Sequence, residues 1–174
     1  MKTWVVVGLT VLCVSAVATR ITLAHDQGKK AALRAKLLGA SEVPPINTEG
    51  SATFKAQVQH DDSITFAVTF ENLSTNLIQS HIHFAQTNVA GGIMIWLCGG
   101  DSQPACPPGT SGRFEGTITP ANVTGPANQG ITAGDLASAL SVIKDGEGYV
   151  NLHTTKFPGG EIRGQINGRN DNDQ

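Results

Sequence analysis

Two neighbouring segments of this chain alternate strictly between apolar and polar residues. The apolar positions of residues 51–60 and 63–71 are Ala52, Phe54, Ala56 and Val58, then Ile64, Phe66, Val68 and Phe70. Alternation with a period of two places all apolar side chains on one face of a β-strand. The sequence His-Asp-Asp-Ser at 60–63, between the segments, is typical of a turn. The chain is therefore predicted to contain a β-hairpin with one buried face.

Further short apolar or alternating segments, separated by glycine and proline turns, continue along the chain. They predict additional strands at residues 33–40, 78–84, 93–97, 112–119, 148–154 and 160–166. One helix is expected where Thr132 would cap it, Asp135 would complete a capping box and Gly146 would end it. This pattern predicts an all-β protein: an antiparallel Greek-key or immunoglobulin-like sandwich, or a barrel, with one short helix.

The start of the chain has the composition of a secretory signal peptide. Lys2 precedes an apolar run at 4–18 that ends in the small-x-small pattern Ala-Val-Ala, with a later cleavage option at 22–24. A transmembrane helix needs about 20 residues, and this run is shorter; an uncleaved anchor is the alternative. We predict a signal peptide at 1–18 (or up to 24), a linker at 19–32, one domain at 33–167 and a disordered tail at 168–174. The expected localisation is secreted or periplasmic, without membrane association after cleavage.

The charge and the cysteine content of the chain argue against two classes of function, nucleic-acid binding and nucleophilic catalysis. The formal net charge of −2 offers no basic excess for binding nucleic acid. Beyond the leader the chain has two cysteines, Cys98 and Cys106, on either side of a loop rich in glycine, proline and serine. In an oxidising compartment we expect them to form a disulfide. Nucleophilic catalysis has no support, because the cysteines are then engaged and no Gly-x-Ser-x-Gly motif is present.

Three histidines are the candidate functional residues. On a strand at 78–84, His81 and His83 project side by side on the face opposite the core. His153 lies on the non-core face of the strand at 148–154. If these strands are neighbours, the three imidazoles converge on the outer, solvent-facing side of the sandwich. Neutral imidazole binds copper, zinc, nickel and iron, so we predict a site for one transition-metal ion, copper before zinc, with a coordination position left open.

Three polar residues are candidates for a second layer around this site. Asn151 shares a strand with the third histidine, and Glu161 and Arg163 follow on the last predicted strand. Such residues commonly hold the second nitrogen of a metal-bound imidazole. The alternative is that the histidines are structural and hydrogen-bonded, and that the protein is a non-enzymatic interaction module. His25 and His60 fall in the linker and the turn and are expected to be solvated.

Three blocks of sequence carry a family resemblance. They are Leu-Gly-Ala-Ser-Glu-Val-Pro-Pro at 38–45, Ser-His-Ile-His at 80–83, and a final block at 149–166 that contains Tyr-Val-Asn-Leu-His-Thr and Pro-Gly-Gly-Glu-Ile-Arg-Gly-Gln-Ile. In this order they resemble the chordin domain (CHRD) family. That family includes animal chordin, an extracellular antagonist of growth-factor signalling, and small exported proteins of bacteria and other organisms. The resemblance implies an extracytoplasmic β-domain, with an extracellular protein partner as one option, more firmly than it implies any reaction.

A second resemblance is to copper/zinc superoxide dismutase, a Greek-key sandwich that carries a His-x-His pair and holds copper outside its barrel. His81 and His83 match that pair. The chain departs from that pattern because it has no histidine that could bridge two metals and no His/Asp set for zinc. Without these groups the resemblance supplies no complete motif for dismutase-like redox activity, even if copper binds.

Overall fold

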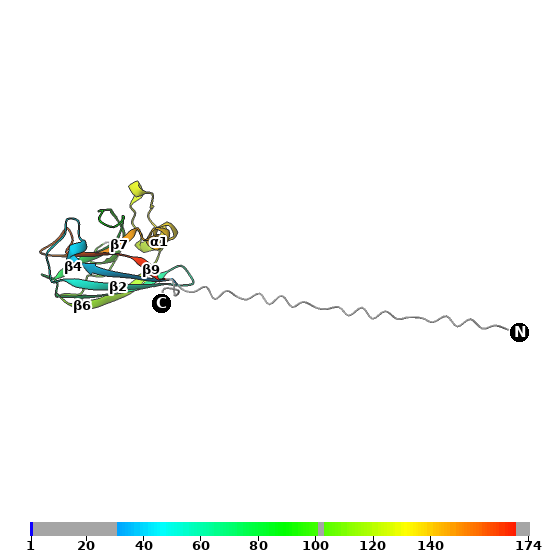
Figure 1. The fold of residues 1–174 in the computed structure, drawn as a ribbon, viewed down its shortest axis with the longest axis horizontal. Helices are drawn as coiled ribbons and strands as arrows, with labels where there is room; N and C mark the ends of the chain where they lie inside the picture. Colours follow the sequence, from blue (N-terminus) through cyan, green and yellow to red (C-terminus); the bar gives the residue numbers. More distant parts are fainter. Residues whose placement is uncertain (2–30, 101–102, 170–174) are drawn as a thin grey trace.

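The chain folds into an antiparallel β-structure with one α-helix among the residues that the structure describes (Figure 1). The structure is a computed structural model and describes residue 1, residues 31–100 and residues 103–169. The strands are β1 (Ala32–Leu38), β2 (Ser51–Val58), β3 (Ile64–Glu71), β4 (Leu77–Phe84), β5 (Gly92–Cys98), β6 (Gly112–Ile118), β7 (Gly148–Thr154), β8 (Ile162–Gln165) and β9 (Asn167–Arg169). The helix, α1, spans Leu136–Lys144. These elements confirm the predicted all-β class with one short helix.

The strands pair in the order β5-β4-β7-β8-β1-β2-β3-β6, and β9 pairs with β1. This sheet folds over on itself into a nearly closed sandwich, with β4 and β7 in one layer and β2 and β6 in the other (Figure 1). Apolar side chains from both layers fill the space between them. The largest fully buried ones include Leu37, Phe54, Phe70, Ile82, Leu152 and Ile162. The opposite face of β4, β7 and β8 is thereby left for the polar candidate residues.

The predicted hairpin is confirmed. β2 and β3 pair antiparallel with Phe54 opposite Val68, and the alternating apolar residues of both strands are buried. In the turn, the Asp61 carboxylate accepts hydrogen bonds from the backbone N–H and the hydroxyl of Ser63, at 3.2 Å and 2.7 Å. This side-chain turn satisfies a backbone donor where the ladder ends.

The helix begins later than the capping pattern indicates. Asp135, not Thr132, is the N-cap, because its carboxylate accepts the Ser138 backbone N–H at 3.0 Å. Gly134 has a φ of 84°, a left-handed conformation that an α-helix cannot contain. The spacing from Thr132 to Asp135 instead marks a turn, in which the backbone N–H of Asp135 donates to the carbonyl of Thr132 at 3.1 Å.

The C-terminal part of the domain is longer than expected. Residues 167–169 form β9 and pair with Ala32 to Arg34 of β1, although the sequence places a disordered tail from residue 168. The sequence of this strand shows no apolar alternation, because the strand is held by backbone pairing rather than by an apolar face. Residues 170–174 lie outside the described residues, as do the predicted leader and most of the predicted linker. No helix in the described ranges is long and apolar enough to cross a membrane.

The predicted disulfide is confirmed between Cys98, at the end of β5, and Cys106, with the Cα atoms 5.0 Å apart. The bond closes a short loop, because the two cysteines are separated by eight positions. Restricting the unfolded chain is the main way in which such a bond stabilises a protein.

Removing this disulfide is expected to lower the free energy of unfolding by about 2 to 3 kcal/mol, the value for a loop of this length. The measurement is urea denaturation of the Cys98→Ser/Cys106→Ser variant beside the oxidised parent. The parent unfolded in the presence of reductant should match the variant. A variant as stable as the oxidised parent would contradict this expectation.

Candidate metal centre

Pairing between β4 and β7 brings the three candidate histidines together. The strands are antiparallel neighbours, with Gln79 opposite His153, His81 opposite Asn151, and His83 opposite Tyr149. In this register all three histidines lie on the face of the sheet that points away from the core. His153 lies two residues from Asn151, the partner of His81, so the two histidines are diagonal neighbours on adjacent strands, within side-chain reach.

The three imidazoles form a compact cluster. The centroid of the His81 ring is 4.5 Å from that of His153 and 5.1 Å from that of His83, and the His83 and His153 centroids are 6.4 Å apart. One nitrogen from each ring lies within 4.8 Å of the others. Ligands of a tetrahedral ion at bonds of about 2.0–2.1 Å are about 3.3–3.4 Å apart. A small inward movement of the rings would therefore bring the nitrogens to bonding distance.

The cluster is buried, and the expectation that it faces solvent is wrong. His81 is 1% exposed, His153 6% and His83 8%. The rings do lie on the outer face of the sheet, but neighbouring segments cover them. The carbonyl of Gly91, before β5, reaches His83, and that of Pro158, between β7 and β8, reaches His153. Strand alternation identifies the face of a side chain but carries no information about connecting segments that fold over it.

Backbone carbonyls fix the protonation of two rings. The Nδ1 of His83 is 3.0 Å from the carbonyl oxygen of Gly91, and the Nδ1 of His153 is 3.0 Å from that of Pro158. Because a carbonyl can only accept, each Nδ1 carries the proton and each Nε2 is left unprotonated, with a lone pair that can accept. The Nδ1 of His81 is 3.0 Å from the Nε2 of His83 and must then donate to it. Holding one nitrogen by a carbonyl while the other faces inward is typical of metal-binding histidines.

Two of the inward nitrogens have no partner. The Nε2 atoms of His81 and His153 are buried and accept no hydrogen bond in the described structure. A buried polar atom without a partner costs about 1–3 kcal/mol. An electron-pair acceptor placed between the rings, such as a metal ion, would remove that cost.

Burial keeps the cluster neutral. It lowers the pKa of His81 to about 3, and the proximity of His153 and His83 adds to the effect. Burial also lowers the pKa of His83 to about 4, against the effect of the Gly91 carbonyl, and lowers the pKa of His153. At neutral pH the three imidazoles are therefore unprotonated, which is the form that binds metals.

Aromatic rings enclose the histidines. Trp96 of β5 stands edge-on to His81, with centroids 4.3 Å apart, and Tyr149 stacks parallel to His83 at 4.7 Å. The guanidinium carbon of Arg163 lies 3.7 Å from the centroid of the Tyr149 ring. An Arg163–Tyr149–His83 stack thus separates one side of the cluster from solvent.

The three residues predicted for a second layer form hydrogen bonds with groups other than the histidine rings. Asn151 donates hydrogen bonds to the Glu42 carboxylate and, at 3.0 Å, to the carbonyl of Ile162. Arg163 donates to the carbonyl of Val89 at 3.0 Å. Within the described residues, neither they nor Glu161 hydrogen-bonds an imidazole.

Glu161 instead joins three segments of chain. Its carboxylate accepts the hydroxyls of Thr48 (2.6 Å), Ser74 (2.9 Å) and Thr154 (2.7 Å) and the backbone N–H of Ser74 (2.8 Å). Although burial opposes ionisation, these hydrogen bonds hold the pKa of the Glu161 carboxyl below its usual value. The residue is fully buried and acts as a structural anchor.

Sequence reasoning missed several parts of the site. Trp96 is opposite His81 in the pairing of β4 with β5, but it lies within an apolar segment whose sequence is typical of a core strand. Glu42 is buried although it lies beside two prolines, and burial raises its pKa to about 6 despite the Asn151 hydrogen bond and the Arg163 charge. The Gly91 and Pro158 carbonyls leave no signal in the sequence, since every residue has one.

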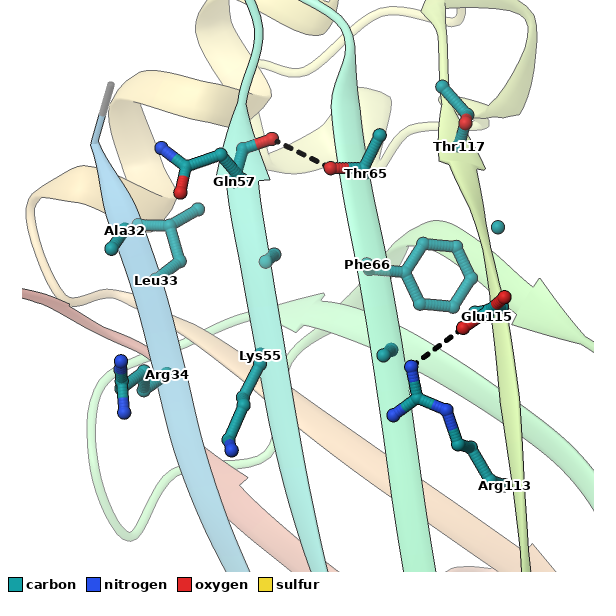
Figure 2. Close-up of a pocket in the computed structure, with 13 residues that line it drawn as sticks. Ala32, Leu33, Arg34, Lys55, Gln57, Thr65, Phe66, Arg113, Glu115 and Thr117 are labelled. Carbon is teal, nitrogen blue, oxygen red and sulfur yellow. Dashed lines mark hydrogen bonds and ion pairs between the residues drawn. The ribbon is translucent and has the colours of Figure 1, made fainter. Parts of the chain in front are cut away.

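A different cavity, of about 530 Å³, lies on the outer face of β1, β2, β3 and β6 (Figure 2). Its charged side chains are Arg34, Lys55, Arg113 and Glu115. Arg113 donates a hydrogen bond to Glu115 at 2.6 Å, and none of the described residues that line the cavity is a histidine or cysteine. It offers no metal-binding chemistry and is separate from the histidine cluster.

The family comparison agrees with the fold. The family model described as the CHRD domain matches residues 33–166, from the second residue of β1 to the residue that follows β8. Comparison with curated proteins and with solved structures finds no match.

Proposed function

This chain belongs to the CHRD domain family, and we propose that it binds one transition-metal ion, copper in preference to zinc, through His81, His83 and His153. Family membership supplies the fold, whereas the function must come from the site. The observation that carries the proposal is the pair of buried Nε2 atoms without a partner, on two rings of a neutral three-histidine cluster.

The preference for copper follows from the ligand set. Neutral imidazoles bind copper(II) more tightly than zinc(II) in the general order of divalent-ion affinities. Three protein ligands leave one position open for water or a small anion. The cluster offers no carboxylate and no thiolate, so magnesium and calcium are poorly suited to it.

Metal titration of the full chain, stripped of metal with a chelator, tests the proposal. Calorimetry with Cu(II) and with Zn(II) is expected to give one bound ion per chain, with copper bound more tightly. At 100 times its dissociation constant the ion should stabilise the fold by about 2.7 kcal/mol.

Matched variants localise the binding. His81→Ala/His83→Ala should abolish the stoichiometric site. His60→Ala, which removes an exposed histidine from the β2–β3 turn, should bind as the parent does. Equal binding by the parent and the double variant would remove the proposal.

We further propose that the protein is exported, to a secreted or periplasmic location. Its Cys98–Cys106 disulfide is of the kind that persists in oxidising compartments, and the leader-like composition of residues 1–18 supports the same conclusion. Amino-terminal sequencing of the mature protein tests this: a chain that begins at residue 19 or 25 is expected, and an intact Met1 would contradict it.

A second candidate function, an extracellular interaction module with structural histidines, is favoured by one observation. Val43 and Val89 are exposed large apolar side chains, at 42% and 49%; Val43 follows Glu42, and the carbonyl of Val89 accepts a hydrogen bond from Arg163. This alternative predicts no metal-dependent rise in melting temperature, so the same titration separates the two functions.

A further inference from the structure

We propose that a small oxyanion, a phosphate, carbonate or short carboxylate, binds in a second site formed by Lys36 and Arg163. The site is a cavity of about 240 Å³ between β1, β8 and the segment that links β4 to β5. The residues that line it and carry polar side chains include Lys36, Ser41, Thr87, Asn88, Arg163 and Asn167. This inference does not depend on metal binding by the histidines.

Arg163 is a buried cation without a counter-ion. It is 3% exposed, and within the described part of the chain it forms no ion pair. One of its five N–H groups donates to the Val89 carbonyl at 3.0 Å, and its plane covers Tyr149. A buried charge is costly unless it is paired, so the guanidinium favours an anion beside it.

The Glu42 carboxylate interacts electrostatically with Arg163 but does not neutralise the charge of the guanidinium. The carboxylate accepts a hydrogen bond from Asn151 and is not among the groups that line the cavity. Burial raises the pKa of Glu42 to about 6, so this carboxylate loses its charge once the pH falls below that value.

Lys36 gives the cavity a second positive charge. It lies on β1, exposed, and lines the same cavity as Arg163 on the adjacent strand β8. Two cations facing one space repel each other unless an anion lies between them. Among the residues that the structure describes, no carboxylate lines the cavity.

The remaining lining groups can complete the recognition of an oxyanion. The side chains of Ser41, Thr87 and Asn88 have no hydrogen-bond partner in the ranges that the structure describes. Hydroxyl and amide groups can each donate to an anion oxygen, and a planar guanidinium matches carboxylate and phosphate oxygens in pairs. The volume suits one small ion rather than a polymer.

Titration of the full metal-free chain with inorganic phosphate tests the site, with bicarbonate and acetate as parallel arms that identify the preferred oxyanion. Calorimetry is expected to show one saturable site for at least one of the three. Lys36→Gln should weaken that binding about tenfold, the usual effect of losing one charge-assisted hydrogen bond. Arg163→Gln should abolish it.

Lys55→Gln is the matched control, because Lys55 is an exposed lysine on neighbouring β2 that does not line this cavity. It should leave the affinity unchanged. The proposal is overturned if none of the three anions binds saturably, or if Lys36→Gln and Lys55→Gln weaken binding equally. Because Lys36 is exposed, its variant tests the site even if Arg163→Gln does not fold.

Discussion

Lowering the pH from 7 to 5 is expected to reduce the free energy of unfolding of the metal-free protein by about 2 to 4 kcal/mol. The cause is the buried histidine cluster. The folded pKa of His81 is about 3 and that of His83 about 4, both below the ordinary 6.5, and the pKa of His153 is lowered as well. The unfolded chain therefore takes up protons first as the pH falls below 6.5.

The sign follows from this order of protonation. Stability from the neutral cluster is complete above pH 6.5 and is lost as the pH falls toward 4 and 3. By pH 5, each histidine with a pKa lowered in this way contributes about 2 kcal/mol less to the free energy of unfolding than at neutral pH. Glu42 offsets part of the loss, because its pKa is raised to about 6 and its protonation in the folded state adds stability between pH 6 and 4.5.

Urea denaturation at pH 7, 6 and 5 measures the effect. His81→Gln/His83→Gln should unfold with a much weaker pH dependence than the parent, whatever its absolute stability. His60→Gln should keep the pH dependence of the parent, since His60 is exposed and is not part of the cluster. If the free energy of unfolding falls with pH equally in all three proteins, the cluster does not control acid unfolding.

Replacing Glu161 by alanine is expected to destabilise the fold by about 3 to 5 kcal/mol, because three hydroxyls and one backbone N–H lose a charged acceptor inside the protein. These donors come from the segments before β2, between β3 and β4, and at the end of β7. The carboxylate thus ties the turn after β7 to both layers of the sandwich.

Glu161→Gln should cost less, about 1 to 2 kcal/mol, because its amide oxygen still accepts and the hydroxyl of Thr154 can rotate. Glu115→Ala is the control: the Arg113–Glu115 pair is exposed, with side-chain exposures of 56% and 68%, and its loss should cost less than about 1 kcal/mol. Thermal and urea unfolding of the three variants give the comparison. An alanine variant at 161 as stable as the control variant would refute the anchoring role.

Alternation predicted the strands because the core of this protein is built from strand faces. Phe54, Val68 and Ile82 are buried for the reason that the pattern gives: each lies on the inward face of its strand. β9 and the start of α1 were missed because backbone pairing and a left-handed Gly134 decide them. Neither leaves an apolar pattern in the sequence.

For the site, the sequence predicts a shared face but not a distance. The alternation of side chains along a strand places His81, His83 and His153 on the outer side. The register between β4 and β7 sets how close they come. Glu161 was expected beside an imidazole, but it follows the turn after β7 and bonds to hydroxyls on three other segments. Burial of the rings depends on how the connecting segments that carry Gly91 and Pro158 fold over them.

The central claim is that His81, His83 and His153 bind one metal ion. A crystal structure of the copper-loaded protein, with an anomalous difference map at the copper edge, tests it most directly. We expect a single peak, with one nitrogen of each of the three rings at about 2.0–2.1 Å from it. Copper located instead at His60 or at the amino terminus, with the cluster empty and its rings unmoved, would contradict it.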